Sequence, residues 1–299
     1  ALMREGGIRS LKPAELDDEL ALMATTLESS FGKDLGSVSL SSLTKNQDRS
    51  LQLFSELLFH PRFDEQRLEL TRRHALEMIR RQNDDPKELA DRELAKAIYA
   101  GHPLGVFPTG ASVAAITRND ISAFHQRFVR PENLILAVSG DFDRSSLLAT
   151  LNRLIGSVQV QGSLQLPVIP PISIRFAPAV LHAPKQVNQS VIRMGHLGIS
   201  KDDPDLYAIR VLDYILGGSF TSRLMMEIRT NQGLAYNVGS RFDVGRRFAG
   251  SFTAETETKA GATAKTIDLM TAIIAGVRKE PVTGQELKLA KDAIINSFL

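Results

Sequence analysis

An arginine and a tyrosine with six residues between them are the side chains of this chain best suited to chemistry. The stretch "GGSFTSRLMMEIRTNQGLAY" (217–236) contains Arg229 and Tyr236. A guanidinium and a phenol that converge on one point could donate hydrogen bonds to a peptide carbonyl or to an oxyanion. Each residue also has a purely structural interpretation. A cation is favourable at a helix C-terminus, and a tyrosine can lie at the edge of a core. Periodicity alone favours the structural interpretation of each.

The residues around this pair predict the elements that would position it. Gly217 and Gly218 follow an apolar helix and indicate its C-terminal cap and a turn. Phe220, Leu224 and Ile228 recur at a spacing of four, which predicts a helix with a buried stripe that ends near Arg229. Alternating residues from Tyr236 to Phe242 and from Phe248 to Ala254 predict a β-hairpin turned at "GRR".

A second candidate is the sequence "HALEM" (74–78), which is half of an inverted zinc motif, HxxEH. In that motif two histidines hold zinc and the glutamate activates water. Here Met78 stands where the second histidine would be. One histidine and one glutamate on a helix face cannot hold zinc alone, so we interpret His74 and Glu77 as part of a partly exposed helix face.

The composition excludes several classes of protein. The chain has 299 residues, of which 43% are hydrophobic and 23% charged, and a net charge of +2 without a basic run. These values argue against a nucleic-acid surface. The absence of cysteine excludes disulfides, thiolate metal sites and a cysteine nucleophile. No apolar run reaches the roughly 18 residues of a membrane span. No HExxH pair, nucleophile elbow, Walker loop or dinucleotide-binding fingerprint occurs.

The length predicts two domains of roughly 150 residues each. "GSVQVQGSLQLPVIPPISI" contains no charge and three prolines, which indicates a linker. We therefore expect a first domain at 1–157, a linker at 158–176 and a second domain at 177–299. Each half mixes helices with antiparallel strands, so the predicted class is α+β, with one mainly antiparallel sheet per domain and helices packed on it.

The expected elements follow from periodicity, proline and glycine. The predicted helices are 12–30, 46–59, 63–82, a helix that starts at the capped Asp85-Pro86, 144–156, a helix face from Leu206 to Leu216, 260–279 and 284–299. The predicted strands are 38–43, a buried strand at 133–142, a strand pair near 179–197 and the hairpin described above.

The sequence around Arg229 and Tyr236, together with much of the first half of the chain, resembles a known family. "LGGSFTSRLMMEIRTNQGLAYNVGSRF" resembles the second-domain signature of the pitrilysin/insulinase family of inverted-zincin metallopeptidases. The segment from "LLFHPRFDEQRLELTRRHALEM" to "NLILAVSGDFD" resembles the first domain of that family throughout. The resemblance covers essentially the whole chain, and the "SRL…IR…GLAY" pattern is its most specific part.

The resemblance implies an architecture and a role for the Arg–Tyr pair. In the family, homologous α+β domains occur in pairs, and two pairs enclose a chamber, in one chain or in two subunits. A zinc site in one first domain faces an Arg–Tyr pair in a second domain from the other half. Arg229 and Tyr236 match that pair and its spacing. The resemblance therefore implies that they bind the substrate peptide and steady the charge formed during attack.

The residues that bind zinc in the family pattern are not matched in this chain. "MREGGIRS" occupies the turn that follows HxxEH, which puts the motif's glutamate at Ala1, its second histidine at Leu2 and its first histidine before the chain begins. "LTRRHALEMI" aligns with the later ligand segment and puts the third ligand at Met78. A shift by one residue would place Glu77 there without restoring Ala1 or Leu2. Alanine, leucine and methionine offer no imidazole or carboxylate. We therefore expect no catalytic residue and no metal ligand in this chain.

Three functions remain open. The first is the non-catalytic subunit of a heteromeric zinc metallopeptidase, which binds unfolded or short peptides and supplies Arg229 and Tyr236 to the zinc site of a homologous partner. This chain then holds no cofactor, and the zinc lies in the partner. The second is an active zinc-dependent endopeptidase of the same family. The third is a structural or chaperone-like subunit without a substrate role. Whether the chain is itself an enzyme stays open.

The two ends of the sequence and its lack of cysteine lead to expectations about missing segments and about the cellular compartment. The chain opens abruptly at "ALMREGG" and stops inside a helical pattern at "AIINSFL". We expect an upstream segment to be missing and the second domain to be truncated at its C-terminal end. The absence of cysteine fits a bacterial periplasm, which we slightly favour, and also fits the cytoplasm.

Overall fold

The computed structural model describes residues 2–32, 34–156, 158–160, 162–173 and 177–297. The chain forms two compact units, and each is described by itself. Unit 1 comprises Ala1–Arg80 and Pro108–Val168, and unit 2 comprises Arg81–Phe107 and Ile169–Leu299. Helices and small antiparallel sheets occur in both units, so the predicted α+β class is confirmed.

Unit 1 is built from helices around one two-stranded sheet. Strands β1 (Thr26–Phe31) and β2 (Gly36–Ser41) pair antiparallel. The helices are α1 (Leu2–Glu5), α2 (Pro13–Leu22), α3 (Gln47–Phe59), α4 (Glu65–Arg81), α6 (Gly110–Ala115), α7 (Arg118–Phe128) and α8 (Arg144–Leu151), and α8 continues into the π-helical turn η4 (Asn152–Gly156). The core lies where α2, β1 and α3 meet, and it includes Leu16, Leu27, Leu53 and Leu57.

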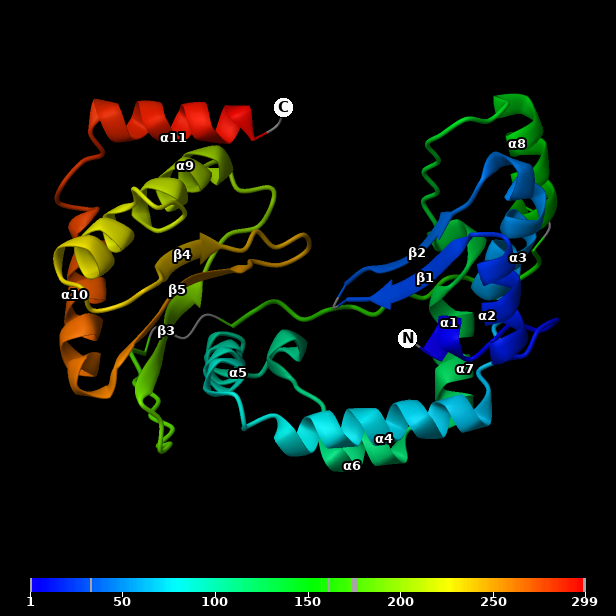
Figure 1. Ribbon diagram of the computed structural model, residues 1–299, viewed down its shortest axis with the longest axis horizontal. Helices are drawn as coiled ribbons and strands as arrows, with labels where there is room; N and C mark the ends of the chain where they lie inside the picture. Colours follow the sequence, from blue (N-terminus) through cyan, green and yellow to red (C-terminus); the bar gives the residue numbers. More distant parts are fainter. Residues whose placement is uncertain (1, 33, 157, 161, 174–176, 298–299) are drawn as a thin grey trace. The chain divides into compact units, whose positions relative to one another are not determined.

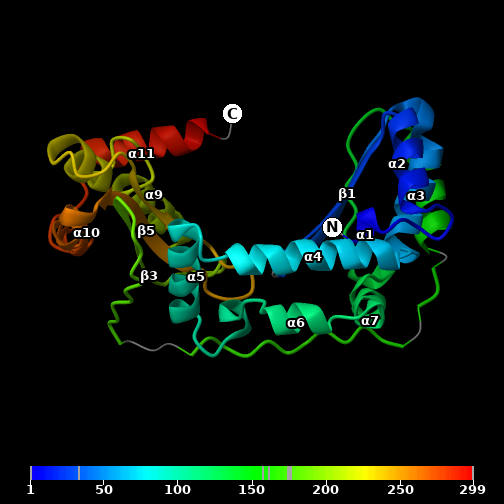
Figure 2. The same ribbon diagram turned by 60° about the horizontal axis from the view of Figure 1, so that its bottom comes forward.

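Helix α4 and helix α6 lie side by side in unit 1, as both views show (Figures 1 and 2). Arg72 on α4 fixes this arrangement. Its Nη1 donates to the carbonyl oxygens of Val113, Ala114 and Ile116 at 3.0, 3.0 and 2.7 Å. These carbonyls lie at the C-terminal end of α6, where a helix leaves acceptors without partners and a cation is favourable.

Two predictions for the first half are wrong. The helix predicted at 12–30 ends at Leu22, because the chain reverses at Ala24 with a positive φ of 47° and continues into β1. Leu27 is buried as a strand residue rather than as part of a helix face. The strand predicted at 133–142 does not form. No described strand pairs with this run, and the Ile135 side chain is fully exposed (100%).

Unit 2 is built on a three-stranded antiparallel sheet with the order β3-β5-β4. The strands are β3 (Gln189–Leu197), β4 (Val238–Phe242) and β5 (Ser251–Lys259), and β4 and β5 form the predicted hairpin. The helical elements are α5 (Pro86–Ile98), α9 (Leu206–Leu216), the π-helical η5 (Met225–Asn231), α10 (Thr263–Gly276) and α11 (Gly284–Asn296). The strand pair predicted near 179–197 is wrong. Residues 177–188 contain no strand, and β3 pairs with β5 instead.

Helix α5 packs against β3, although the two elements lie far apart in the sequence (Figure 1). The side chain of Arg193 on β3 is 9% exposed, and its Nε lies 2.5 Å from Asp91 Oδ1 and 3.5 Å from Glu255 Oε2. Lys87 Nζ lies 2.6 Å from Glu257 Oε1. The ion pairs join α5 to the sheet, so residues from the first half of the sequence complete unit 2.

The predicted linker at 158–176 has no helix or strand among its described residues. The expected domain boundaries, 1–157 and 177–299, stay a prediction. Within the described ranges, no helix is both long and apolar enough to cross a membrane.

Candidate functional site

Arg229 and Tyr236 lie together on the surface of unit 2. The Cζ atom of Arg229 is 4.9 Å from the centroid of the Tyr236 ring and 5.8 Å from the centroid of the Phe220 ring. A guanidinium within about 6 Å of a ring centroid is attracted by the negative face of the ring. Tyr236 is 84% exposed and Phe220 is 76% exposed. One cation therefore contacts two aromatic rings that are open to solvent.

Two buried threonines on β5 hold the segment that carries Tyr236. Thr258 Oγ1 donates to the carbonyl oxygen of Leu234 at 2.8 Å, and Thr256 Oγ1 donates to that of Asn237 at 2.7 Å. Both threonines lie on the inward face of β5 and are almost fully buried. These bonds fix the backbone on either side of Tyr236 while its ring stays exposed.

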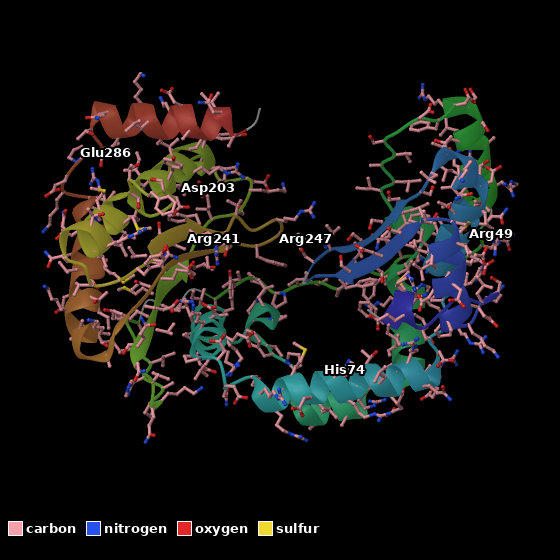
Figure 3. The ribbon with its side chains drawn as sticks, viewed as in Figure 1. Arg49, His74, Asp203, Arg241, Arg247 and Glu286 are labelled. Atoms are coloured by element: carbon pink, nitrogen blue, oxygen red, sulfur yellow. The ribbon has the colours of Figure 1, made fainter. Side chains whose placement is uncertain are left out.

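The helix that carries Arg229 is anchored by its apolar face and by one ion pair. Leu224 and Ile228 are completely buried in the core of unit 2. Arg223 donates to Glu286 through Nε at 2.7 Å and through Nη2 at 3.0 Å. The hydrogen bonds from Arg223 and Thr283 lower the pKa of Glu286 to about 2, against an opposing effect of desolvation. Glu286 lies near the start of α11 (Figure 3), so the pair ties α11 to the Arg229 helix.

A tight approach between the end of α9 and β4 sets the position of the whole motif. A Cβ atom on Gly217 would lie 2.2 Å from the backbone nitrogen of Ser240, so only glycine fits there. Asp213 on α9 accepts hydrogen bonds from Ser240 Oγ at 2.7 Å and from the Phe242 N–H at 3.2 Å. Burial raises the pKa of Asp213, and these hydrogen bonds oppose the shift.

The buried stripe predicted from Phe220, Leu224 and Ile228 is wrong at one of its three residues. Leu224 and Ile228 are buried as expected, but Phe220 is exposed. The helix begins only at Arg223, and Phe220 lies in the turn before it, so the spacing of four does not apply to Phe220. The ring contacts Arg229 instead of the core.

The arrangement leaves the hydrogen-bonding groups of the pair available. Throughout the described part of the chain, neither the Arg229 guanidinium nor the Tyr236 hydroxyl has a hydrogen-bond or ion-pair partner. A guanidinium carries five N–H donors in its own plane. The site can therefore donate to a carbonyl, a carboxylate or an oxyanion that approaches from solvent.

The positions that align with zinc ligands do not fit a zinc ion. Ala1 lies outside the described residues. Leu2 packs against the core of unit 1, and Met78 on α4 is 75% exposed. An alkyl group and a thioether are not the nitrogen, thiolate or carboxylate ligands that zinc requires.

The "HALEM" motif is part of an exposed helix face, as expected. His74 is exposed on α4 (Figure 3), and Glu77 Oε2 lies 3.1 Å from Arg80 Nη1. Across the described ranges, no three His, Asp or Glu side chains gather into a group that could hold a metal ion. That no ligand set exists in this chain stays a prediction from the sequence.

A separate pocket of about 640 Å³ lies in unit 1 at the turn between α3 and α4. Arg9 Nη2 lies 3.0 Å from His60 Nδ1, and burial together with Arg9 lowers the pKa of His60. Arg118 donates to the carbonyl oxygens of Arg62 and Phe63 at 2.8 and 2.9 Å. These contacts hold the turn, and the lining carries charges of both signs, including Arg62, Asp64 and Glu65.

Comparison with protein families identifies the class of this chain. Residues 115–294 match the family described as "Peptidase M16 inactive domain", and residues 9–107 match "Insulinase (Peptidase family M16)". The chain therefore belongs to peptidase family M16. The resemblance drawn from its motifs is confirmed.

The curated relatives carry names of two kinds, zinc protease and non-peptidase homolog. The chain is 28% identical to an uncharacterized zinc protease of Mycobacterium leprae over 257 residues, which are 84% of this chain and 57% of that relative. It is 27% identical to the "Non-peptidase homolog YmxG" of Helicobacter pylori, over 87% of this chain and 60% of the relative. The chain thus spans just over half the length of these curated relatives.

Solved structures have the same fold. A peptidase M16 inactive domain from Pseudomonas fluorescens matches with a TM-score of 0.83 and 27% identity, and the match covers 99% of this chain and 72% of that one. A protease from Helicobacter pylori matches with a TM-score of 0.86 at 20% identity and with the same coverage.

Sequence reasoning missed three residues that shape the site. Phe220 contacts Arg229, and Thr256 and Thr258 hold the Tyr236 segment. The strict alternation of β5 could have indicated that the threonines face inward. No pattern in the sequence indicated that the ring of Phe220 leaves the core.

Proposed function

We propose that this chain is a non-catalytic member of a zinc peptidase assembly and that Arg229 and Tyr236 bind the substrate peptide. A homologous subunit supplies the zinc and its catalytic base. The assembly cleaves unfolded or short peptides, and this chain contributes binding without a metal of its own.

The observation that carries the proposal is the exposed contact between Arg229 and Tyr236. The guanidinium carbon lies over the Tyr236 ring, 4.9 Å from its centroid, and no carboxylate of the described chain pairs with the guanidinium. A cation that is fixed but unpaired favours a negatively polarised ligand. The buried threonines beneath Tyr236 reduce the motion of the site, which lowers the entropy lost on binding.

Each residue has a distinct task in the proposed function. The Arg229 guanidinium donates to the carbonyl oxygen of a bound peptide and stabilises the negative charge that develops when the carbonyl is attacked. The Tyr236 hydroxyl donates to the same carbonyl or to its neighbour. Zinc in the partner would supply the activated water, and no residue of this chain takes part in that step.

The match to an inactive-type domain supports a non-catalytic role, as does the non-peptidase name of the Helicobacter pylori relative. The unsuitability of Leu2 and Met78 as zinc ligands points the same way. Family membership supports peptide as the ligand class.

Peptide binding tests the proposal without knowledge of the partner. Fluorescence anisotropy of a short, unstructured, fluorescein-labelled peptide is measured with the purified full-length protein. We expect Arg229→Ala and Tyr236→Ala each to weaken binding about tenfold. The first removes a charged hydrogen-bond donor to the peptide, and the second removes a hydroxyl donor next to it. Arg241→Ala is the matched control, since Arg241 is an exposed arginine of the same unit that pairs with Asp243 at 3.1 Å. Equal binding by all four proteins would contradict the proposal and leave a structural role.

The competing function is an active zinc peptidase, which is favoured by the "zinc protease" name of the Mycobacterium leprae relative. Cleavage separates the two. The proposal predicts that the purified protein alone does not cleave peptides. Cleavage that a chelator abolishes would establish the active peptidase instead.

A further inference from the structure

Phe220 is an exposed aromatic residue with a defined contact. Its ring is 76% exposed, yet it lies against Arg229 rather than against the core. An exposed ring contributes little to folding, because most of its apolar surface stays in water. A ring placed beside an unpaired cation on the surface is suited to contact a ligand.

The geometry gives the site two different surfaces. The guanidinium carbon of Arg229 lies over the rings of both Phe220 and Tyr236, and within the described residues its N–H donors have no hydrogen-bond partner. A peptide carbonyl that accepts from those donors brings the neighbouring side chain of the peptide close to the rings. That side chain meets apolar aromatic surface and a nearby positive charge.

We propose that Phe220 is a third residue of the site and that it selects peptides with a bulky apolar side chain next to the carbonyl bound by Arg229. This inference rests on the proposed function of Arg229 and Tyr236. An apolar side chain covers the exposed rings and releases water from them. A lysine or arginine at the same place is repelled by Arg229.

Two labelled peptides test the selection. They are unstructured, fluorescein-labelled and identical except for one central residue, which is leucine in one and serine in the other. We expect the full-length protein to bind the leucine peptide about five- to tenfold more tightly, the ratio expected for partial burial of one apolar side chain. Phe220→Ala should reduce this ratio to near one, and Phe220→Trp should preserve it, because an indole keeps both the apolar surface and the cation–π contact.

A matched control comes from the same unit. Tyr207 on α9 is also 76% exposed, and Tyr207→Ala should leave the ratio unchanged. Arg229→Ala should weaken binding of both peptides by a similar factor, because it removes the hydrogen bond to the carbonyl common to both. Circular dichroism of each variant checks that the fold is retained, which is expected because none of these side chains lies in the core.

The outcomes separate the inference from the function on which it rests. If Phe220→Ala keeps the leucine preference while Arg229→Ala weakens binding, the inference is overturned and the proposed function stands. If neither peptide binds the unsubstituted protein, both are overturned.

Tryptophan fluorescence gives an independent readout. These 299 residues contain no tryptophan, so Phe220→Trp places a new fluorophore at the site. Subtraction of the emission of the unsubstituted protein isolates the emission of this tryptophan. We expect its maximum to move to shorter wavelength when the leucine peptide binds. An emission that stays unchanged at saturating peptide would overturn the inference.

Discussion

The guanidinium carbon of Arg229 lies 4.9 Å from the centroid of the Tyr236 ring. Arg229 comes from a π-helical segment, and Tyr236 comes from the approach to strand β4. The two residues meet because Leu224 and Ile228 anchor the helix in the core and because β5 threonines hold the chain beside Tyr236. The contact therefore depends on the sheet of unit 2 as much as on the motif itself.

The planarity of Arg229 should matter as well as its charge. Arg229→Lys keeps the positive charge but loses the planar guanidinium and its fork of donors. We expect peptide binding to weaken about fivefold, which is less than for Arg229→Ala, with a change in unfolding free energy below about 0.5 kcal/mol. Anisotropy titration and thermal unfolding measure the two effects. Binding as tight as that of the unsubstituted protein would show that charge alone is sufficient.

Acid should weaken unit 2 through Glu286. Its folded pKa of about 2 lies below the unfolded value of 4.5, so its stabilising effect is fully present above about pH 4.5 and is lost as the pH falls toward 2. We expect Glu286→Gln to lower the unfolding free energy by about 1–2 kcal/mol at neutral pH, because the Arg223 pair is partly exposed and is screened by solvent.

The pH dependence is the more specific readout for Glu286. Urea unfolding between pH 5 and pH 2.5 should show a smaller loss of stability for Glu286→Gln than for the unsubstituted protein. Asp292→Ala on the same helix is the control, since Asp292 pairs with Lys288 at 3.3 Å with both side chains exposed. Parallel curves for all three proteins would show that Glu286 does not titrate abnormally.

Two glycines of the motif should respond differently to alanine. Gly217→Ala places a methyl group against the backbone of Ser240, and we expect it to cost about 3 kcal/mol or more. Gly233 has a positive φ of 59° but open space around its Cα, so Gly233→Ala should cost only about 1 kcal/mol. Denaturant unfolding of both variants gives the comparison, and equal costs would contradict the close approach at Gly217.

Helix α5 should loosen when its ion pair to the sheet is removed. Arg193→Ala removes the cation that joins Asp91 to β3, and we expect a loss of about 1–3 kcal/mol together with faster hydrogen exchange across residues 86–98. Arg210→Ala on the exposed face of α9 is the control. Unchanged exchange in α5 would show that this helix does not depend on Arg193.

Local signals predicted much of the fold. The helix at 284–296 begins with a capping box of Thr283 and Glu286, and α5 is capped by Asp85 and has proline in its first turn. The alternation along β4 and β5 predicted the hairpin, because one face of that sheet is buried. These features depend on residues close in sequence, which a pattern can show.

Long-range contacts explain what the sequence did not show. The run at 133–142 is apolar, but burial of a strand requires a neighbour, and none of the described strands pairs with it. The packing of α5 on β3 joins positions about a hundred residues apart, which periodicity does not show. In the site, the family resemblance indicated Arg229 and Tyr236, whereas the place of Phe220 depends on where the helix begins.

The zinc content of the purified full-length protein, without any partner, tests the central claim most directly. The measurement is elemental analysis after removal of loosely bound metal. We predict close to no zinc per chain, because Leu2 and Met78 offer no ligands where the family would have them. One tightly bound zinc per chain would contradict the account and identify an active peptidase.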